Sequence, residues 1–473
     1  MKRIFLLLLV IWNTCLISAQ YDVNCRLGFS YEISNNSQWG KNKPVIMKVY
    51  QNSPAEKAGI KQNDIIVQID DFKVDDISLD DVDSLLTASE SFETRLVIRN
   101  FSEQSKSILI TKECISSDAF TESQLADAFS MYSVESTHDR LFVCPFTTSV
   151  TRDEVDFSEF KSFDFALAED KSLSDIESVL NEILKEELVK KGLRYNTLNP
   201  DFIVHTYYSF DKNPNFRRRS KETENQSPAI RYDISRDRIT QFPFHYFSTP
   251  ESESEYILQL GVRFIDQKNV KGRTLWECVA NELMRAPFAI NEYAIIHLPL
   301  MCMQFPYVKY NRNAQYILTK KGFNYTGINY SIYQINEVVE VDLDSPAYEA
   351  GIRPGDIVEK IENKRMDYSV EEFTGAYRTF ISKTIQYRDV HSRFTNADGF
   401  QNCMLWDTFK YPQIVKTLKN DKYKTAFAYL YAFAPYVNPE RSTSCTFNIR
   451  RNGEKLTIVV RPTFYSEKTI ELN

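Results

Sequence analysis

The residue types that perform chemistry are present in this chain, but they are not spaced as in a catalytic or metal-binding centre. There is no GxSxG or HExxH motif, no phosphate-binding loop and no dinucleotide-binding fingerprint. The five histidines are far apart in the sequence: His138, His205, His245, His297 and His391. Two of them, His205 and His297, fall in an expected strand and an apolar helix, where a buried structural histidine is expected. A triad assembled only by folding is the alternative. The sequence predicts no enzyme, no cofactor and no metal.

The cysteines do not form a metal-binding pattern either. Eight are present, and none has a partner at CxxC spacing, so a structural zinc site is not predicted. Cys25 and Cys114 could form a disulfide in an oxidising compartment. We expect two buried thiols instead, because free cysteine is among the most buried residue types.

The chemistry that the sequence does indicate depends on a duplicated pattern containing glycine. Residues 53–60, SPAEKAGI, recur as residues 345–352, SPAYEAGI, and the register continues from 64–69, DIIVQI, to 356–361, DIVEKI. Each copy predicts a short helix that begins at Pro, ends at Gly and is followed by a strand. Proline suits the first helical position and glycine the left-handed position after the last one.

The repeat resembles the bacterial PDZ signature SPAxxAGIxxGDxIxxI, which is present almost intact twice. The first copy has Asn63 where the signature has glycine, as the second copy does at Gly355. Upstream, residues 26–30, RLGFS, resemble the carboxylate-binding loop of PDZ domains, and residues 325–329, YTGIN, resemble it more weakly. A PDZ groove lies between a strand edge and a helix, and a bound peptide adds a strand to that edge.

The resemblance implies which residues bind the peptide. Gly28 and Gly327 would let successive N–H groups converge on a terminal carboxylate. The other candidate site residues are Leu27, Phe29, Ser30, Leu79, Val82 and Leu86 in the first module, and Ile328, Phe373 and Tyr377 in the second. Packing in the core of a small domain is the alternative role for each of these side chains.

Both modules are expected to be small, partly open β-barrels with capping helices. Their groove helices are predicted at 78–88 and 369–380, and each begins with a capping box. The predicted closing strands are 94–99 and 107–111 in the first module, and 446–450 and 455–461 in the second. In the second module an insert at 382–444 separates the helix from these strands and is far longer than an ordinary loop. This insert could cover the groove or form a separate contact surface.

Residues 137–306, between the modules, predict an α+β sandwich domain. Its expected strands are 141–146, 160–165, 201–208, 256–266 and 273–279, and its expected helices are 174–191 and 292–303. The order is similar to a bacterial envelope family, domain of unknown function 4136, on residues 160–165, FKSFDF, 200–204, PDFIV, and 304–306, QFP. That resemblance implies a compartment but no activity. The polar stretch 211–254, with its arginines 217–219, is expected to be a solvated loop.

The first residues predict a cleaved secretory signal. Lys2 and Arg3 precede an apolar run, and Ala19 provides the small residue at the cleavage position. We therefore expect an exported protein in the periplasm or cell envelope of a Gram-negative bacterium, with lipidation at Cys15 as the alternative. The expected boundaries are 1–19 for the signal, 22–113 for the first PDZ-like domain, 114–136 for a helical linker, 137–306 for the central domain and 320–466 for the second PDZ-like domain.

Charge and hydropathy restrict the partners. A net charge of −7 argues against nucleic acid, and no later stretch is long and apolar enough to span a membrane. The favoured function is a non-catalytic adaptor that binds the C-termini of proteins or peptides through its PDZ grooves. The alternative is a structural, glycan-binding or lipid-binding envelope protein whose PDZ folds are structural. An unrecognised hydrolase is the third possibility.

Overall fold

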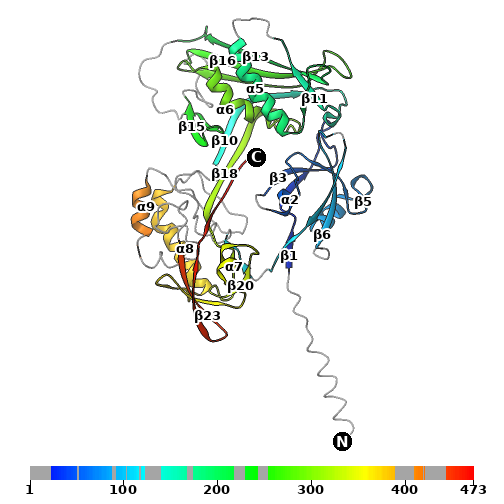
Figure 1. Ribbon diagram of the computed structural model, residues 1–473. Helices are drawn as coiled ribbons and strands as arrows, with labels where there is room; N and C mark the ends of the chain where they lie inside the picture. Colours follow the sequence, from blue (N-terminus) through cyan, green and yellow to red (C-terminus); the bar gives the residue numbers. More distant parts are fainter. Residues whose placement is uncertain are drawn as a thin grey trace.

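Figure 1 shows three parts in the computed structural model: an upper domain of strands and helices, and two smaller modules below it. The structure describes residues 23–50, 53–87, 92–102, 104–116, 119–122, 140–167, 174–217, 229–242, 254–388, 410–418, 420 and 444–473. The sheets formed by these residues are open. The expected multidomain α+β architecture is therefore confirmed. Among the same residues, no helix combines the length and apolar character needed to cross a bilayer.

The first module is built on a sheet that has β2 at its edge. Across the sheet the strands are β2 (Phe29–Ile33), β3 (Pro44–Val49), β4 (Ile65–Ile69), β6 (Glu93–Arg99) and β7 (Lys106–Thr111), with β5 (Phe72–Lys73) beside β4. The helix α3 (Leu79–Thr87) follows β5 along the chain. Its first turn is closed by the expected capping box, in which Ser78 and Asp81 exchange hydrogen bonds.

A disulfide joins the beginning and the end of the first module. Strands β1 (Val23–Arg26) and β8 (Glu113–Ser116) are antiparallel, and Cys25 lies directly opposite Cys114. The two sulfur atoms are bonded. The expectation of two free thiols was therefore wrong. The spacing of the two cysteines in the sequence could not show that they share one rung of a β-ladder.

The repeated motif has the same local structure in both modules. Helix α2 (Pro54–Lys57) is capped by the side chain of Ser53, and α7 (Pro346–Ala350) is capped by that of Ser345. Asn63, which replaces the glycine of the signature, has φ +70° and its counterpart Gly355 has φ +86°. Asparagine tolerates the left-handed region better than most side chains, so the substitution preserves the turn.

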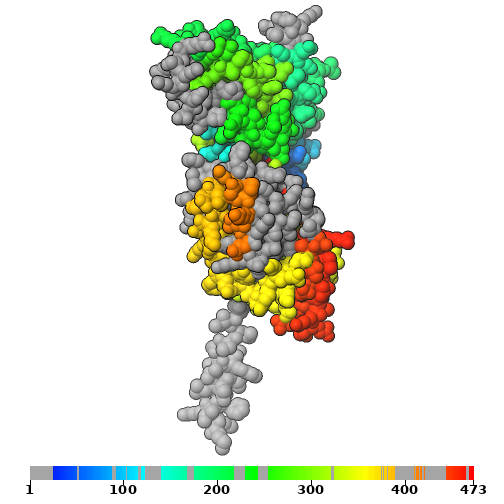
Figure 2. Space-filling view, turned by 90° about the vertical axis from the view of Figure 1, so that its left-hand side faces the viewer, coloured from blue at the N-terminus to red at the C-terminus, as the bar shows by residue number. Residues whose placement is uncertain are grey.

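In its described residues the second module contains two short sheets and three α-helices. Its elements are β19 (Ile328–Ser331), β20 (Val338–Val341), α7, β21 (Ile357–Ile361), β22 (Lys364–Arg365), α8 (Val370–Thr384), α9 (Tyr411–Leu418), β23 (Cys445–Arg451) and β24 (Glu454–Val460). The capping box at Ser369 and Glu372 begins α8 as expected. Helix α9 lies in the long insert and packs against α8; Figure 2 shows both helices on one face of the module.

The central domain is an eight-stranded sheet with α5 (Ser174–Lys190) and α6 (Ile290–Cys302) packed together on it (Figure 1). Across the sheet the strands are β12 (Arg194–Tyr195), β11 (Ser162–Phe165), β13 (Phe202–Lys212), β16 (Tyr256–Asp266), β17 (Thr274–Met284), β10 (Arg140–Val150), β18 (Arg312–Tyr325) and β25 (Thr463–Leu472). The last two extend the sheet beyond residue 306. The second module is thus inserted between two neighbouring strands of the central sheet.

The polar stretch that we expected to be a loop contains a hairpin whose first strand is mostly buried. Strands β14 (Ala229–Asp233) and β15 (Arg238–Phe242) pair with each other. The guanidinium of Arg231 is buried and donates to the buried carboxylate of Glu282 at 2.9 Å. The arginine therefore belongs to a core ion pair, which charge patterning could not distinguish from a solvated residue.

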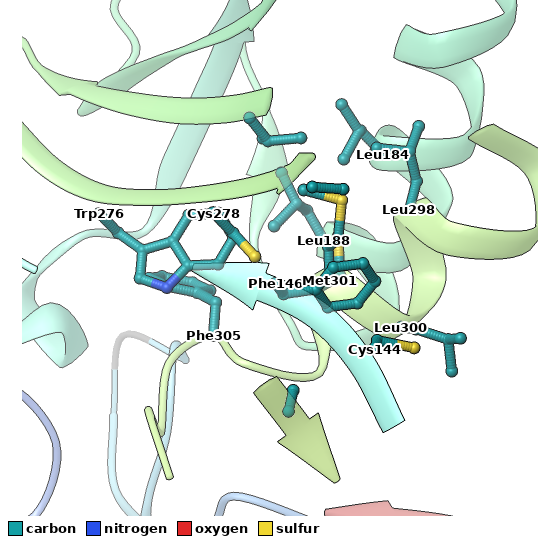
Figure 3. Packing of buried hydrophobic residues seen from close by; sticks show 14 of the residues in the cluster. Cys144, Phe146, Leu184, Leu188, Trp276, Cys278, Leu298, Leu300, Met301 and Phe305 are labelled. Carbon is teal, nitrogen blue, oxygen red and sulfur yellow. The ribbon is translucent and has the colours of Figure 1, made fainter. Parts of the chain in front are cut away.

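The first module is packed firmly against the central domain. The ring centroid of Phe101 lies 4.8 Å from that of Trp39 and 5.5 Å from that of Phe305. Figure 3 shows Phe305 beside Trp276 in the central core, and their centroids are 5.7 Å apart. One continuous hydrophobic cluster includes residues of both parts. The first module is therefore held in a fixed position by aromatic contacts.

Candidate peptide-binding grooves

The first candidate groove lies between β2 and α3. Strand β2 pairs with β3 on one side, and on its other side no described strand pairs with it. The hydroxyl of Tyr31 on β2 donates to the carboxylate of Asp83 on α3 at 2.7 Å. This contact connects the strand to the helix across the candidate groove, and neither residue was among the sequence candidates. The alternation after Phe29 could have identified Tyr31, because residues two apart on a strand share a face.

The loop before β2 has one N–H group, that of Gly28, whose surroundings matter for ligand binding. The carbonyl of Leu27 accepts from the N–H of Ala55 at 3.0 Å, and that of Gly28 accepts from the N–H of Tyr50 at 3.0 Å. The C=O of Leu27 and the N–H of Gly28 belong to one trans peptide unit and point in opposite directions, so the N–H of Gly28 points away from Ala55. No described residue accepts a hydrogen bond from it.

Gly28 cannot readily be replaced by another residue. Its φ is +87°, and a Cβ built on it would lie 2.2 Å from the Cβ of Ser53. Gly327 repeats the arrangement with φ +81° and the same 2.2 Å approach to Ser345. Both loops are therefore formed in the same way, although only the first resembles the PDZ pattern closely in sequence.

The other candidates of the first module fall into two groups. Leu27, Val82 and Leu86 are buried and belong to the core of the module, whereas Phe29 packs against that core and is only partly buried. Leu79, at the start of α3, is 53% exposed. Ser30 is partly buried on the alternate face of β2. Phe29 and Leu79 are therefore the candidates with surface available to a ligand.

The second groove already contains a segment of the chain itself. Strand β9 (Ala119–Phe120) pairs antiparallel with β19, so that Phe120 lies opposite Tyr330. Farther along, the carboxylate of Glu122 accepts from the N–H of Thr326 at 2.8 Å and from that of Gly327 at 3.2 Å. The insert had been considered as a cover for this groove. Most of the insert lies outside the described residues, so its role stays a prediction. The described segment in this groove belongs to the linker.

The linker itself differs from its expected structure. We expected a helix over 114–136, but its described part consists mainly of β8 and β9, and residues 123–136 lie outside the described residues. Ile328 and Phe373 are buried beneath the bound segment. The side chain of Tyr377 lies outside the described residues.

The environment of Glu122 is unusual for a carboxylate. Burial raises its pKa to about 8, and the nearby charge of Asp342 acts in the same direction. Hydrogen bonds from Thr326 and Gly327 act against this shift. Asp342 in turn accepts from the hydroxyl of Tyr325 and the side-chain amide of Asn329. The acidic group is thus held in a closed polar site.

Of the two histidines that the structure describes, His297 has the surroundings of a structural residue. His297 is fully buried in α6, and its Nδ1 lies 2.8 Å from the carbonyl oxygen of Tyr293. Burial lowers its pKa well below the ordinary value. His205 lies on β13, and the other three histidines fall outside the described residues. Within the described part of the chain, no three metal-ligating side chains come together.

Comparisons with known proteins agree with this architecture. The model of the PDZ domain matches residues 45–100 and 337–375, and that of a domain of unknown function (DUF4136) matches residues 147–307. A PDZ domain protein from Parabacteroides distasonis is 48% identical in sequence, with a TM-score of 0.82, and the match covers 95% of this chain and 99% of the other. This chain belongs to the same family of PDZ domain proteins.

Other similarities of this PDZ domain protein cover smaller parts. A serine endoprotease from Yersinia pestis matches at 15% identity and a TM-score of 0.17, over 24% of this chain and 36% of that one. A PelC dodecamer subunit from Paraburkholderia phytofirmans matches at 12% identity and a TM-score of 0.15, over 34% of this chain and 95% of that one. No curated protein matches the sequence. The PDZ domains are protein-interaction modules, so proteins or peptides are the partners of this chain.

Proposed function

We propose that this protein is a non-catalytic adaptor whose first groove binds the C-terminal end of an extended chain by strand addition to β2. The observation that carries the proposal is the occupied second groove. There the same fold holds an extended segment on the equivalent strand and a carboxylate at the equivalent glycine. The first groove has the same glycine geometry and a strand edge that no described strand covers.

We further propose that the protein acts outside the cytoplasm, in the periplasm or cell envelope of a Gram-negative bacterium. The support is the disulfide between Cys25 and Cys114, because such bonds persist mainly in oxidising compartments. The expected signal segment, residues 1–19, lies outside the described residues.

The proposed binding mode can be tested with fluorescent peptides derived from envelope-protein C-termini, measured by anisotropy on the full-length protein. Binding in the micromolar range is expected, and amidation of the peptide terminus should weaken it about tenfold or more, because a hydrogen bond to a charged group contributes about 1.5–3 kcal/mol. Equal binding of acid and amide, or silence across the library, would contradict C-terminal recognition.

A matched pair of variants locates the site. Leu79 on α3 and Val459 on β24 are 53% and 54% exposed. Leu79→Lys should reduce peptide affinity at least tenfold, whereas Val459→Lys should leave it unchanged. Equal effects of the two variants would place the peptide elsewhere.

A further inference from the structure

We propose that residues 119–122 are a tethered ligand of the second PDZ module. The module releases this segment when it binds the C-terminal end of another chain. That chain end has an aromatic side chain two residues before its terminal carboxylate. We call residues 119–122 the latch, because while they are bound they connect the linker to the second module. This inference does not depend on whether the first groove binds peptides.

The strand pairing has the direction and place of a PDZ ligand. β9 runs antiparallel to β19, with Ala119 opposite Ser331 and Phe120 opposite Tyr330. The same register carries the chain toward the glycine loop at Gly327. β19 has β20 on its other side, so β9 completes a three-stranded sheet. An external peptide would use the same edge.

The side chain of Glu122 takes the position of a chain terminus. Its carboxylate accepts from the N–H groups of Thr326 and Gly327 and from the hydroxyl of Thr326. Glu122 is only 3% exposed, so these bonds are shielded from water. An internal segment has no terminal carboxyl group, and the acidic side chain supplies the carboxyl oxygens that accept these hydrogen bonds.

An aromatic contact fixes the middle of the segment. Phe120 lies two residues before Glu122, and its ring centroid is 6.5 Å from that of Phe373 on α8. Phe373 and Ile328 are buried at 2% and 0% exposure, so the groove floor is apolar. The pattern that the groove recognises is therefore an aromatic residue, any residue, and a carboxylate.

The segment is held by a short tether rather than by a large interface. Residues 115–118 separate Ala119 from Cys114, which the disulfide fixes to the first module. Only two residues of the segment pair with β19. A short tether gives an effective concentration of about 1 mM. If the segment and an outside ligand both have an intrinsic Kd of about 10 μM, the tethered segment raises the apparent Kd of the outside ligand about 100-fold.

The test uses the full-length protein and a peptide of residues 116–122, SSDAFTE, with a free terminal carboxylate. Leu79→Lys is present throughout to suppress the first groove, and binding is measured by titration calorimetry. The doubly substituted latch, Phe120→Ala with Glu122→Ala, should gain one site that binds the peptide about 100-fold more tightly than the protein with an intact latch. Glu454→Ala, which removes an exposed carboxylate in the β23–β24 hairpin, is the control and should gain nothing.

Amide hydrogen exchange provides a second measurement that does not need the peptide. The N–H groups of Thr326 and Gly327 should exchange faster after Glu122→Ala, and saturating peptide should restore their protection. If the opened protein gains no site and these amides stay protected, residues 119–122 are a permanent structural strand and the proposal is overturned. A dimer of the unsubstituted protein that exchanges this segment between copies, detected by native mass spectrometry, would also overturn it. Failure of the first groove alone would leave both measurements unchanged.

Discussion

Substitution of Gly28 by alanine should disable the first groove by a mechanism that a second glycine can isolate. Gly28 and Gly59 both have positive φ, +87° and +79°. A Cβ on Gly28 would lie 2.2 Å from that of Ser53, whereas a Cβ on Gly59 has no neighbour within 4 Å. The two variants therefore share the backbone strain and differ in the clash.

The difference in stability between the two variants follows from the hydrogen bonds that Ser53 would lose. Left-handed backbone costs a non-glycine residue about 1–2 kcal/mol in either variant. In Gly28→Ala, Ser53 must also move, and its hydroxyl both donates to the carbonyl of Gly28 at 3.0 Å and caps α2 through the N–H of Glu56 at 3.3 Å. Each lost bond costs about 1 kcal/mol. We expect Gly28→Ala to destabilise the module by about 3–4 kcal/mol and Gly59→Ala by about 1–2 kcal/mol.

Hydrogen exchange measured by mass spectrometry can read this difference, because it reports local opening in a protein with several domains. Peptides covering β2 and β3 should exchange about 30-fold faster in Gly28→Ala than in Gly59→Ala, since each tenfold corresponds to about 1.4 kcal/mol. The affinity of the first groove for its C-terminal peptide ligand should fall only in Gly28→Ala. Equal exchange rates in the two variants would refute the steric argument.

Two further outcomes are expected. Burial and Asp342 raise the pKa of Glu122 from 4.5 to about 8. The closed latch should therefore be most stable below about pH 4.5 and should lose stability as the pH rises through 8. The exchange rate of the Gly327 amide, corrected for its intrinsic pH dependence, should increase over this range, and Glu122→Gln should abolish the increase. Cys25→Ser, which leaves Cys114 unpaired, should lower the free energy of unfolding of the first module by about 2–5 kcal/mol in denaturant titrations; reducing agent should have the same effect on the unsubstituted protein and none on the variant.

The parts of the fold that local chemistry determines could be predicted from the sequence. The serine-capped turns at Ser53 and Ser345, the capping boxes at Ser78 and Ser369, and the alternating strand at 256–266 were all expected and are present. Each depends on residues within one turn or one strand. The duplication fixes the register of the motif, because both copies show the same pattern.

The parts that depend on contacts between distant residues could not be predicted. The strand β9 is two residues long and has no periodicity, so its pairing with β19 is decided by the groove that receives it. The buried pair of Arg231 and Glu282 looks like surface charge in the sequence. The candidate groove side chains were also ambiguous, since burial separates Val82 from Leu79 only when the helix is placed on its sheet.

The pairing of β18 with β25 has a mechanical consequence. The chain enters the second module after Tyr325 and leaves it before Thr463, and these two residues are paired with each other. The pairing continues from there to Tyr316 and Leu472 in the central sheet. The module is therefore attached by two strands that lie side by side, and not by a single hinge. To tilt the module, both strands must bend together. A force exerted on a partner held in that module would load the ladder between the two strands along its length.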